Sequence, residues 1–252
     1  MGFSYPSSRV LISEGVFEEA LKQEWKYDIR CDCWFKDNVS FRHMYWDALE
    51  IFDFDIYNSL DVKDKVVVDI GAYVGDPAIY FALKGARKVI AVEPHPKTFE
   101  ETIDNIKLNK LEGIIIPINA GLASKLGGIC IYRNVDVIHT VSTYYKPGEC
   151  NNEVPTMTLE ELIRKYDIDR GAVLKMDCEG CEYDAILNDY EHVRLFNEVY
   201  LEYHAYVAKI PVELLLKKLS RDFICKVVSD YEFYKRHSLN KELIGIIKCI
   251  KK

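Results

Sequence analysis

The sequence lacks the features that place a chain in or across a membrane. None of its apolar runs approaches the roughly 18 residues that a helix needs to cross a bilayer. Its first residues contain no basic stretch followed by an apolar one, as a secretory signal does, and Pro6 stands where a myristoylation signal has Ser or Thr. We therefore expect a cytoplasmic protein with no membrane span.

The sequence also has fewer basic than acidic residues. The 252 residues include 33 Lys and Arg against 40 Asp and Glu, which gives a formal net charge of −7. A protein that holds nucleic acid by neutralising phosphates needs a clustered cationic surface. Nucleic-acid binding is therefore disfavoured, although Lys217-Lys218 and Lys235-Arg236 leave a local basic face open.

The eight cysteines are too few for a disulfide scaffold in a chain of this length. They include two close pairs, Cys31 with Cys33 and Cys178 with Cys181. The second pair is a C-x-x-C motif, typical of a redox dithiol or of half a zinc site, but Cys31 and Cys33 are too close to make a good second zinc knuckle. We interpret the cysteines as scattered thiols in a reducing cytosol, with disulfides expected only if the source is a hyperthermophile.

Residues 1 to about 60 differ from the rest of the chain. They are rich in aromatic and acidic residues and show no alternation of strand and helix patterns. We expect a mainly helical extension there and a main domain over residues 61–252. The aromatic residues of the extension could form a lid over a substrate, part of the core or a dimer interface, and the sequence leaves all three open.

From residue 61 onward, short β-branched runs alternate with amphipathic stretches. This alternation is typical of a parallel sheet with crossover helices. Helices are predicted to begin near Pro77, Pro96, Thr158 and Pro211, with a capping box formed by Thr158 and Glu161. The predicted strands are 65–70, 88–92, 114–118, 172–177, 198–202, 223–228 and 243–250, with further hairpin strands near 129–133.

The turn after the first of these strands carries the first candidate site. It reads Asp69-Ile70-Gly71-Ala72-Tyr73-Val74-Gly75-Asp76, and its glycines let backbone N–H groups approach a ligand at a helix N-terminus. A dinucleotide fingerprint needs glycine where Tyr73 stands, which disfavours an NAD-dependent oxidoreductase. The turn suits a smaller anionic group, such as the carboxylate of a methionine moiety. Glu93 ends the second strand 24 residues after Asp69, the separation expected of an acid that accepts both ribose hydroxyls.

Three segments together resemble a class I S-adenosylmethionine-dependent methyltransferase, and more closely the FkbM family. They are Val67 to Gly75, Val89 to Pro96 and Leu174 to Glu182, of which the last matches the family's Lys-(apolar)-Asp-x-Glu-Gly-x-Glu segment. The resemblance covers roughly residues 62–204 and implies a Rossmann-like, doubly wound, mostly parallel seven-stranded sheet with helices on both faces. The sequence departs from the family at Tyr73, where Asn is common, and at Cys178 and Cys181, where small apolar residues are usual.

The resemblance implies S-adenosylmethionine as the methyl donor and S-adenosylhomocysteine as the product. By this resemblance the glycine turn holds the methionine end and Glu93 the ribose, with Pro94, His95 and Asn119 to Gly121 beside the adenine. Asp177 is implied at the floor of the pocket near the methyl group. All these positions fall at the carboxyl ends of strands, where open α/β sheets bind ligands. Each acid also has a structural alternative, as a helix cap or a solvated strand end. The implied cofactor-binding residues are Asp69, Gly71, Ala72, Tyr73, Gly75, Asp76, Glu93, Pro94, His95, Asn119, Ala120, Gly121 and Asp177.

The candidate catalytic residues follow the fourth and fifth predicted strands. Methyl transfer is an in-line displacement, so the enzyme aligns donor and acceptor while a base takes the proton of an acceptor hydroxyl. Glu179, Glu202 and His204 are candidate bases beside Asp177, and His204 has the alternative of a hydrogen-bonded wall residue. Asp177, Glu179 and Glu202 could instead share a divalent cation, but we do not favour a metal. Glu182 is expected in the first turn of the following helix, where its charge favours the dipole.

The acceptor is not readable from these residues. The family typically methylates hydroxyl oxygens, which implies an O-methyltransferase acting on a small molecule, a sugar or a lipid. A non-catalytic module that binds S-adenosylmethionine for regulation would share the cofactor residues and lack only a base. An RNA methyltransferase that uses the local basic face stays open, and so does a homodimer. Fold analogy alone does not identify a substrate.

Overall fold

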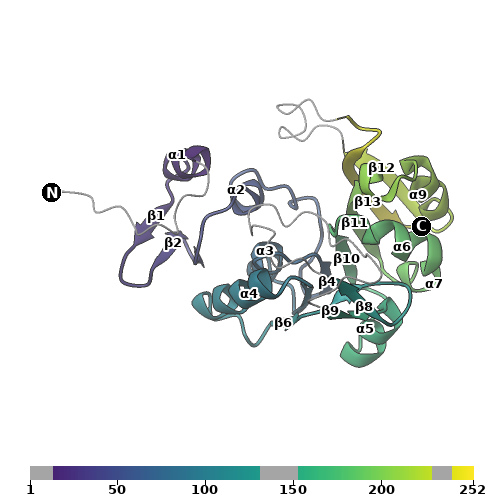
Figure 1. Cartoon of the computed structure of the whole chain (residues 1–252), viewed down its shortest axis with the longest axis horizontal. Coiled ribbons are helices and arrows are strands. Elements are labelled where there is room, and N and C mark those ends of the chain that lie inside the picture. Colours follow the sequence, from purple (N-terminus) through teal and green to yellow (C-terminus); the bar gives the residue numbers. More distant parts are fainter. Residues whose placement is uncertain (1–13, 131–152, 229–239) are drawn as a thin grey trace.

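Seven strands form one sheet in the centre of the molecule (Figure 1). The computed structural model describes residues 14–130, 153–228 and 240–252. The strand order is β12-β13-β11-β10-β4-β5-β6, and in this sheet β13 alone runs antiparallel to its neighbours. The bounds are β4 Val66–Ile70, β5 Lys88–Val92, β6 Ile115–Ile118, β10 Val173–Met176, β11 Glu198–His204, β12 Phe223–Val228 and β13 Ile244–Lys251. The prediction of a doubly wound, mostly parallel seven-stranded sheet is confirmed.

The sheet separates two hydrophobic cores. Every residue of β4 is buried, and Val68 pairs in register with Ile90 of β5 and Leu174 of β10. Successive side chains of a strand point to opposite faces, so a strand buried on both faces needs a continuous apolar run. Val67 belongs to one core cluster and Val68 to the other.

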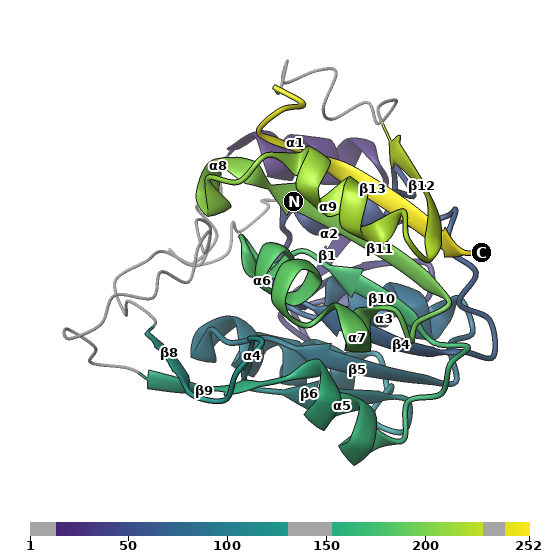
Figure 2. The ribbon, with the colours of Figure 1, turned by 90° about the vertical axis from the view of Figure 1, so that its right-hand side faces the viewer.

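Helices cover both faces of the sheet, as Figures 1 and 2 show. Residues of α2, α3 and α4 pack in the core that contains Val67, and residues of α5, α6, α7 and α9 pack in the core that contains Val68. Thr158 and Glu161 form the predicted capping box at the start of α5. The bounds are α2 Trp46–Phe52, α3 Asp76–Leu83, α4 Pro96–Leu108, α5 Leu159–Tyr166, α6 Cys181–Asn188, α7 Tyr190–Val193, α8 Ala205–Ala208 and α9 Val212–Leu219.

The N-terminal extension contains strands as well as the predicted helices, so a mainly helical extension is not clearly shown. Helix α1 (Glu14–Lys22) and helix α2 are separated by a three-stranded antiparallel sheet. Strands of three or four residues are too short to show a periodicity, and these strands are joined by turns in which Asp32 and Asp37 have positive φ. The three strands are β1 Lys26–Asp28, β2 Cys33–Lys36 and β3 Val39–Phe41.

Aromatic residues of this N-terminal region join the hydrophobic core on one face of the main sheet. Trp25, Trp34 and Phe41 are buried and belong to the same core cluster as Val67 of β4. These three side chains therefore form core together with the sheet. A domain boundary at residue 60 stays a prediction.

A second, three-stranded sheet follows β6 in the chain. It has the order β7-β9-β8, with β7 at Gly121–Leu122, β8 at Gly128–Cys130 and β9 at Glu153–Met157. Of the hairpin strands predicted near 129–133, residues 129–130 lie in β8 and residues 131–133 lie outside the described residues. Over the described residues, no helix has the length and apolar character needed to cross a membrane.

Candidate functional site

A cavity of about 550 Å³ lies at the carboxyl ends of β4, β10 and β11. Helix α2, the loop after it and the first residues of β13 complete its wall. Parallel sheets bind their ligands at this edge. Its described acidic and aromatic lining residues are Asp47, Glu50, Asp76, Asp177, Glu179 and Glu202, and Trp46, Phe54, Tyr57, Tyr73 and Tyr200.

The turn after β4 lies against the segment that follows β10. Gly71 and Gly75 have φ of 78° and 87°, and Tyr73 between them has φ of 50°. A Cβ atom on Gly71 would lie 1.7 Å from the carbonyl oxygen of Asp177, so only glycine fits there. The turn then delivers Asp76, the first residue of α3, to the cavity wall.

A buried ion pair supports this turn. Lys175 Nζ lies 3.0 Å from Asp69 Oδ1 and donates a hydrogen bond of 2.8 Å to the carbonyl oxygen of Gly71. Burial raises the pKa of Asp69 to about 6, although Lys175 opposes the rise. Burial also opposes the charge of Lys175, but Asp69 and Asp177 raise the pKa of its ammonium above the ordinary value. Lys175 lines the cavity, whereas Asp69 is fully buried and does not, so a direct contact of Asp69 with a cofactor stays a prediction.

Asp76 is a fully buried acid in the cavity wall. Neither of its carboxylate oxygens has a hydrogen-bond partner elsewhere in the described residues. Burial, reinforced by the charge of Asp47, raises the pKa of Asp76 well above its ordinary value. Burying a carboxylate without donors is costly, and a cationic ligand group would relieve that cost. The position therefore fits an ammonium group.

Glu93, at the end of β5, differs from Asp76 because its carboxylate accepts hydrogen bonds from several donors. One carboxylate oxygen, Oε1, accepts hydrogen bonds from the His95 N–H at 2.8 Å and from Thr98 Oγ1 at 2.9 Å. The other, Oε2, accepts one from the Tyr73 N–H at 2.9 Å, which ties this strand end to the β4 turn. Burial raises the pKa of Glu93 to about 7 against the effect of these donors. A carboxylate oxygen accepts two hydrogen bonds, so Oε2 has room for one more.

The remaining cofactor candidates lie outside the cavity wall. Asn119 Nδ2 donates to the carbonyl oxygens of Pro94 and of the residue before it, at 3.0 and 2.9 Å, and so fixes the segment after β5. His95 is 7% exposed, and its Nδ1 has no hydrogen-bond partner in the described residues. Ala120 and Gly121 are buried beside them. Their roles toward an adenine ring stay predictions.

Four acidic side chains surround His204 at the end of β11. Its Nε2 atom lies 3.5 Å from Glu179 Oε1, 3.8 Å from Glu202 Oε2 and 3.9 Å from Asp177 Oδ1. Its Nδ1 atom lies 3.1 Å from Glu182 Oε1. Burial lowers the pKa of His204, but the hydrogen bond to Glu182 and the charges of the other acids outweigh it and raise the pKa to about 10. The imidazole is therefore protonated at neutral pH.

The same crowding raises the pKa values of acids in this cluster. Burial raises the pKa of Glu179 to about 7, and burial together with the charge of Asp177 raises the pKa of Glu202 well above its ordinary value. A carboxyl group with a pKa of about 7, as in Glu179, can accept a proton from a bound acceptor. The ligand atoms of Asp177, Glu202 and His204 lie within 4.8 Å of one another, which would also admit the shared cation that we do not favour.

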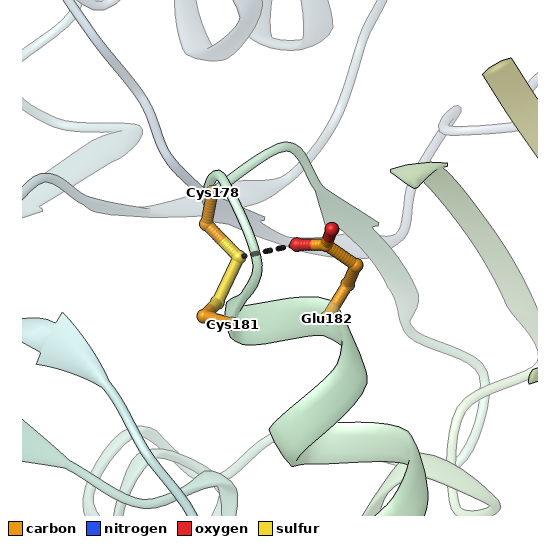
Figure 3. Close-up of side chains that lie close together, drawn as sticks. All are labelled: Cys178, Cys181 and Glu182. Carbon is orange, nitrogen blue, oxygen red and sulfur yellow. Dashed lines mark hydrogen bonds between the residues drawn. A yellow bond between two sulfur atoms is a disulfide. The ribbon is translucent and has the colours of Figure 1, made fainter. Parts of the chain in front are cut away.

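Glu182 connects this cluster to a disulfide between Cys178 and Cys181 (Figure 3). The Glu182 side chain is fully buried, and its Oε1 atom accepts from the backbone N–H of His204 at 2.8 Å. Its Oε2 atom accepts from the N–H of Gly180 at 2.9 Å and lies 3.5 Å from Cys178 Sγ. Glu182 does stand in the first turn of α6, as expected, and it also holds His204.

The interpretation of the cysteines as scattered thiols is wrong for six of them. Besides Cys178–Cys181, disulfides join Cys31 to Cys33 and Cys225 to Cys249. Sequence spacing could not show the last pair, because these cysteines meet as register partners on the antiparallel strands β12 and β13.

The structure thus gathers all four catalytic candidates in one cavity, with part of the predicted cofactor set. We did not single out Lys175 from the sequence. It could have been found as an ionisable residue inside a predicted strand in which its neighbours are apolar. The lining residues of α2 carry no such signal. Predicted site residues in the cavity wall are Gly71, Tyr73, Asp76, Asp177, Glu179, Glu202 and His204, and those outside it are Asp69, Ala72, Gly75, Glu93, Pro94, His95, Asn119, Ala120 and Gly121.

The sequence also matches a known family. The family described as Methyltransferase FkbM domain covers residues 69–211, more than half of the chain. The chain belongs to the FkbM methyltransferase family. The resemblance drawn from the three sequence segments is confirmed, and the protein is by family an S-adenosylmethionine-dependent methyltransferase.

The chain is also similar to individual proteins. The hexuronic acid methyltransferase AglP of Haloferax volcanii is 30% identical over 176 residues, which cover 68% of this chain and 70% of that protein. Uncharacterized protein 158B of Sulfolobus islandicus rod-shaped virus 1 is 44% identical over 62 residues, 23% of this chain and 37% of that protein. The crystal structure of an FkbM methyltransferase from Methylobacillus flagellatus KT superposes with a TM-score of 0.53 at 15% identity, over 80% of this chain and 47% of that one, and shows the shared fold. This chain therefore spans about half the length of the crystallised relative.

Proposed function

We propose that this methyltransferase transfers a methyl group from S-adenosylmethionine to a hydroxyl oxygen of a sugar or a related small molecule. The observation that carries the proposal is the convergence of Glu179, Glu202 and His204 on the cavity that also contains the β4 turn. When bound, S-adenosylmethionine supplies an electrophilic methyl group on a sulfonium. The hexuronic acid methyltransferase among the relatives supports a sugar acceptor.

Residues of the chain fit the methyl donor at three points. Asp76, a buried carboxylate with no hydrogen-bond partner elsewhere in the described residues, suits the ammonium group. Lys175, beside the turn at Gly71, suits the carboxylate of the methionine moiety. Glu93 has a free acceptor position on Oε2 for a ribose hydroxyl.

In this proposal a carboxylate takes the acceptor's proton. His204 is protonated at neutral pH and cannot serve as the base. Glu179, with a pKa of about 7, and Glu202 are placed to accept the hydroxyl proton. The imidazolium of His204 then stabilises whichever of the two acids is ionised. Asp177 completes the negative surroundings of the transferred group.

Carboxyl groups predominate in the cavity wall. Six described carboxyl side chains line it, against Lys175 and His204 as the described cationic ones. Carboxyl oxygens accept hydrogen bonds from hydroxyl groups, which suits an acceptor rich in hydroxyls. We therefore assign the acceptor to sugars and related hydroxyl compounds.

Two measurements test the proposal. Calorimetry with S-adenosylhomocysteine should show binding that Asp76→Asn weakens about tenfold, because one ammonium contact is lost. Glu160→Gln, on the exposed face of α5, is the matched control and should bind as the parent protein does. A screen of sugar acceptors with labelled S-adenosylmethionine should then give product that Glu202→Gln reduces by at least about 100-fold.

Three results decide the matter. No binding of S-adenosylhomocysteine would contradict the donor site. Binding without transfer to any hydroxyl acceptor would favour the regulatory module instead. Transfer that survives in the double variant Glu179→Gln, Glu202→Gln would contradict the assigned base.

A further inference from the structure

The disulfide between Cys178 and Cys181 takes no part in methyl transfer, yet it lies within the segment that shapes the cavity. We propose that this disulfide is a redox-active site, reduced by a dithiol, and that its state controls how His204 and its acids are arranged. The part of the proposal that concerns activity rests on the proposed function. The part that concerns thiol exchange does not.

The disulfide closes a ring of four residues around a cavity acid. Glu179 and Gly180 stand between the two cysteines, with φ of 54° and 113°. Asp177 directly precedes the ring and Glu182 directly follows it. Three of the four acids around His204 thus belong to, or border, the covalent ring. Opening the ring frees the backbone that presents them.

Burial distinguishes this disulfide from the two others in the described part of the chain. Cys178 and Cys181 are both half-buried, so neither cysteine of this pair is closed off from solvent. Each of the other pairs contains a buried partner, Cys33 or Cys249. Attack of a thiolate on a disulfide depends on access to the sulfur that is attacked. Cys178–Cys181 should therefore exchange first.

Figure 3 shows the contact between the Cys178 sulfur and Glu182. Through Glu182 this contact connects the redox state of the disulfide to His204. Cys178 Sγ lies 3.5 Å from Glu182 Oε2, and Glu182 Oε1 holds both the N–H and Nδ1 of His204. A disulfide sulfur has no hydrogen to donate, so this contact gains a donated proton only when Cys178 is a thiol. Reduction thus adds a donor to Glu182 while it removes the covalent closure of the loop.

Reduction of this disulfide by a dithiol is a two-electron thiol–disulfide exchange. A thiolate of the dithiol attacks one sulfur of Cys178–Cys181, and the sulfur–sulfur bond breaks to release the other as a thiolate. The second thiol of the reductant then attacks the mixed disulfide. The protein gains two thiols, and the dithiol leaves as its own cyclic disulfide.

The test follows thiols and histidine signals in the folded protein. Dithiothreitol is titrated under native conditions, and the cysteines are alkylated and counted by mass spectrometry of each peptide. The pKa of His204 is followed in both states by ¹⁵N spectra, with the signal assigned through His204→Gln. We expect Cys178 and Cys181 to be reduced at a dithiol concentration at least about fivefold below that of the other pairs, and the pKa of His204 to fall by about one unit or more. Reoxidation should reverse both changes.

Variants separate this site from general effects of reduction. Cys178→Ser with Cys181→Ser should reproduce the histidine signal of reduced protein and lose its response to dithiothreitol. Cys31→Ser with Cys33→Ser should keep that response. Methyl transfer should fall about tenfold on reduction of the parent protein.

Three outcomes would each overturn the proposal. They are free thiols at 178 and 181 in the protein as purified, resistance of this disulfide to reduction until the protein unfolds, and reduction that leaves the titration of His204 unchanged. A failure to find any methyl acceptor would not overturn it, because the thiol and histidine readouts do not depend on it.

Discussion

Two buried acids on neighbouring segments, Glu93 and Asp76, differ in what surrounds them. Glu93 receives three hydrogen bonds from backbone and hydroxyl donors, and it is complete without a ligand apart from one free acceptor position. Asp76 is equally buried but has no partner elsewhere in the described residues. The protein thus satisfies one acid with its own donors and leaves the other for a cation. In this account the adenosine side of the site is preformed, whereas the cavity side is completed by what it binds.

The largest effect should come from the ion pair behind the cavity. Lys175→Met leaves Asp69 buried without its cation, and breaking a buried pair in this way costs about 3–5 kcal/mol. Urea unfolding should show this loss, while Lys107→Met on the exposed side of α4 should change the free energy of unfolding by less than about 0.5 kcal/mol. If Lys175→Met were as stable as that control, the turn would not depend on this pair.

Stability should fall as the pH rises from 5 to 7.5. The pKa values of Asp69, Glu93 and Glu179 are raised to about 6, 7 and 7, so the folded state holds protons that the unfolded state has released. The raised pKa of His204 acts in the same direction, because its stabilising charge is lost as the pH rises toward 10. We expect the free energy of unfolding to drop by at least about 2 kcal/mol over this range. A flat or rising profile would show that the carboxyl groups are ionised in the folded protein.

Glu93→Gln should lower the free energy of unfolding by a smaller amount than Lys175→Met. A glutamine amide offers one acceptor oxygen where three donors converge, so at least one buried donor loses its partner. We expect a loss of about 1–2 kcal/mol at pH 8. Thermal unfolding against Glu100→Gln, an exposed residue of α4, is the comparison. Equal melting temperatures for the two variants would mean that Glu93 is not the hub that its contacts indicate.

Asp76→Asn should have the smallest effect on stability and the opposite sign to Glu93→Gln. It replaces a buried carboxylate without donors by a neutral group of the same shape, so the protein without ligand should be unchanged or more stable by up to about 1 kcal/mol. Asp104→Asn on the exposed side of α4 serves as the matched control in urea unfolding. A loss of more than about 1 kcal/mol would show that Asp76 has a structural partner after all.

Much of the fold and of the candidate site could be predicted from the sequence, for physical reasons. The five parallel strands are short apolar runs between strong helix-start signals such as Pro96 and Thr158, and the carboxyl ends of such strands must meet at one edge. The juxtaposition of Glu179, Glu202 and His204 follows from that rule. The N-terminal sheet could not be predicted, because three-residue strands carry no period. The pairing of Glu182 with His204 depends on the exact turn of α6 against β11, which spacing does not encode.

The central claim is that a cavity acid awaits a cationic donor. It is tested most directly by calorimetry of S-adenosylhomocysteine binding at pH 7 in buffers of different ionisation enthalpy. The account predicts that the parent protein releases protons on binding, because the ammonium group lowers the raised pKa of Asp76, and that Asp76→Asn releases fewer. Binding with no proton release, or the same release in Asp76→Asn, would contradict it.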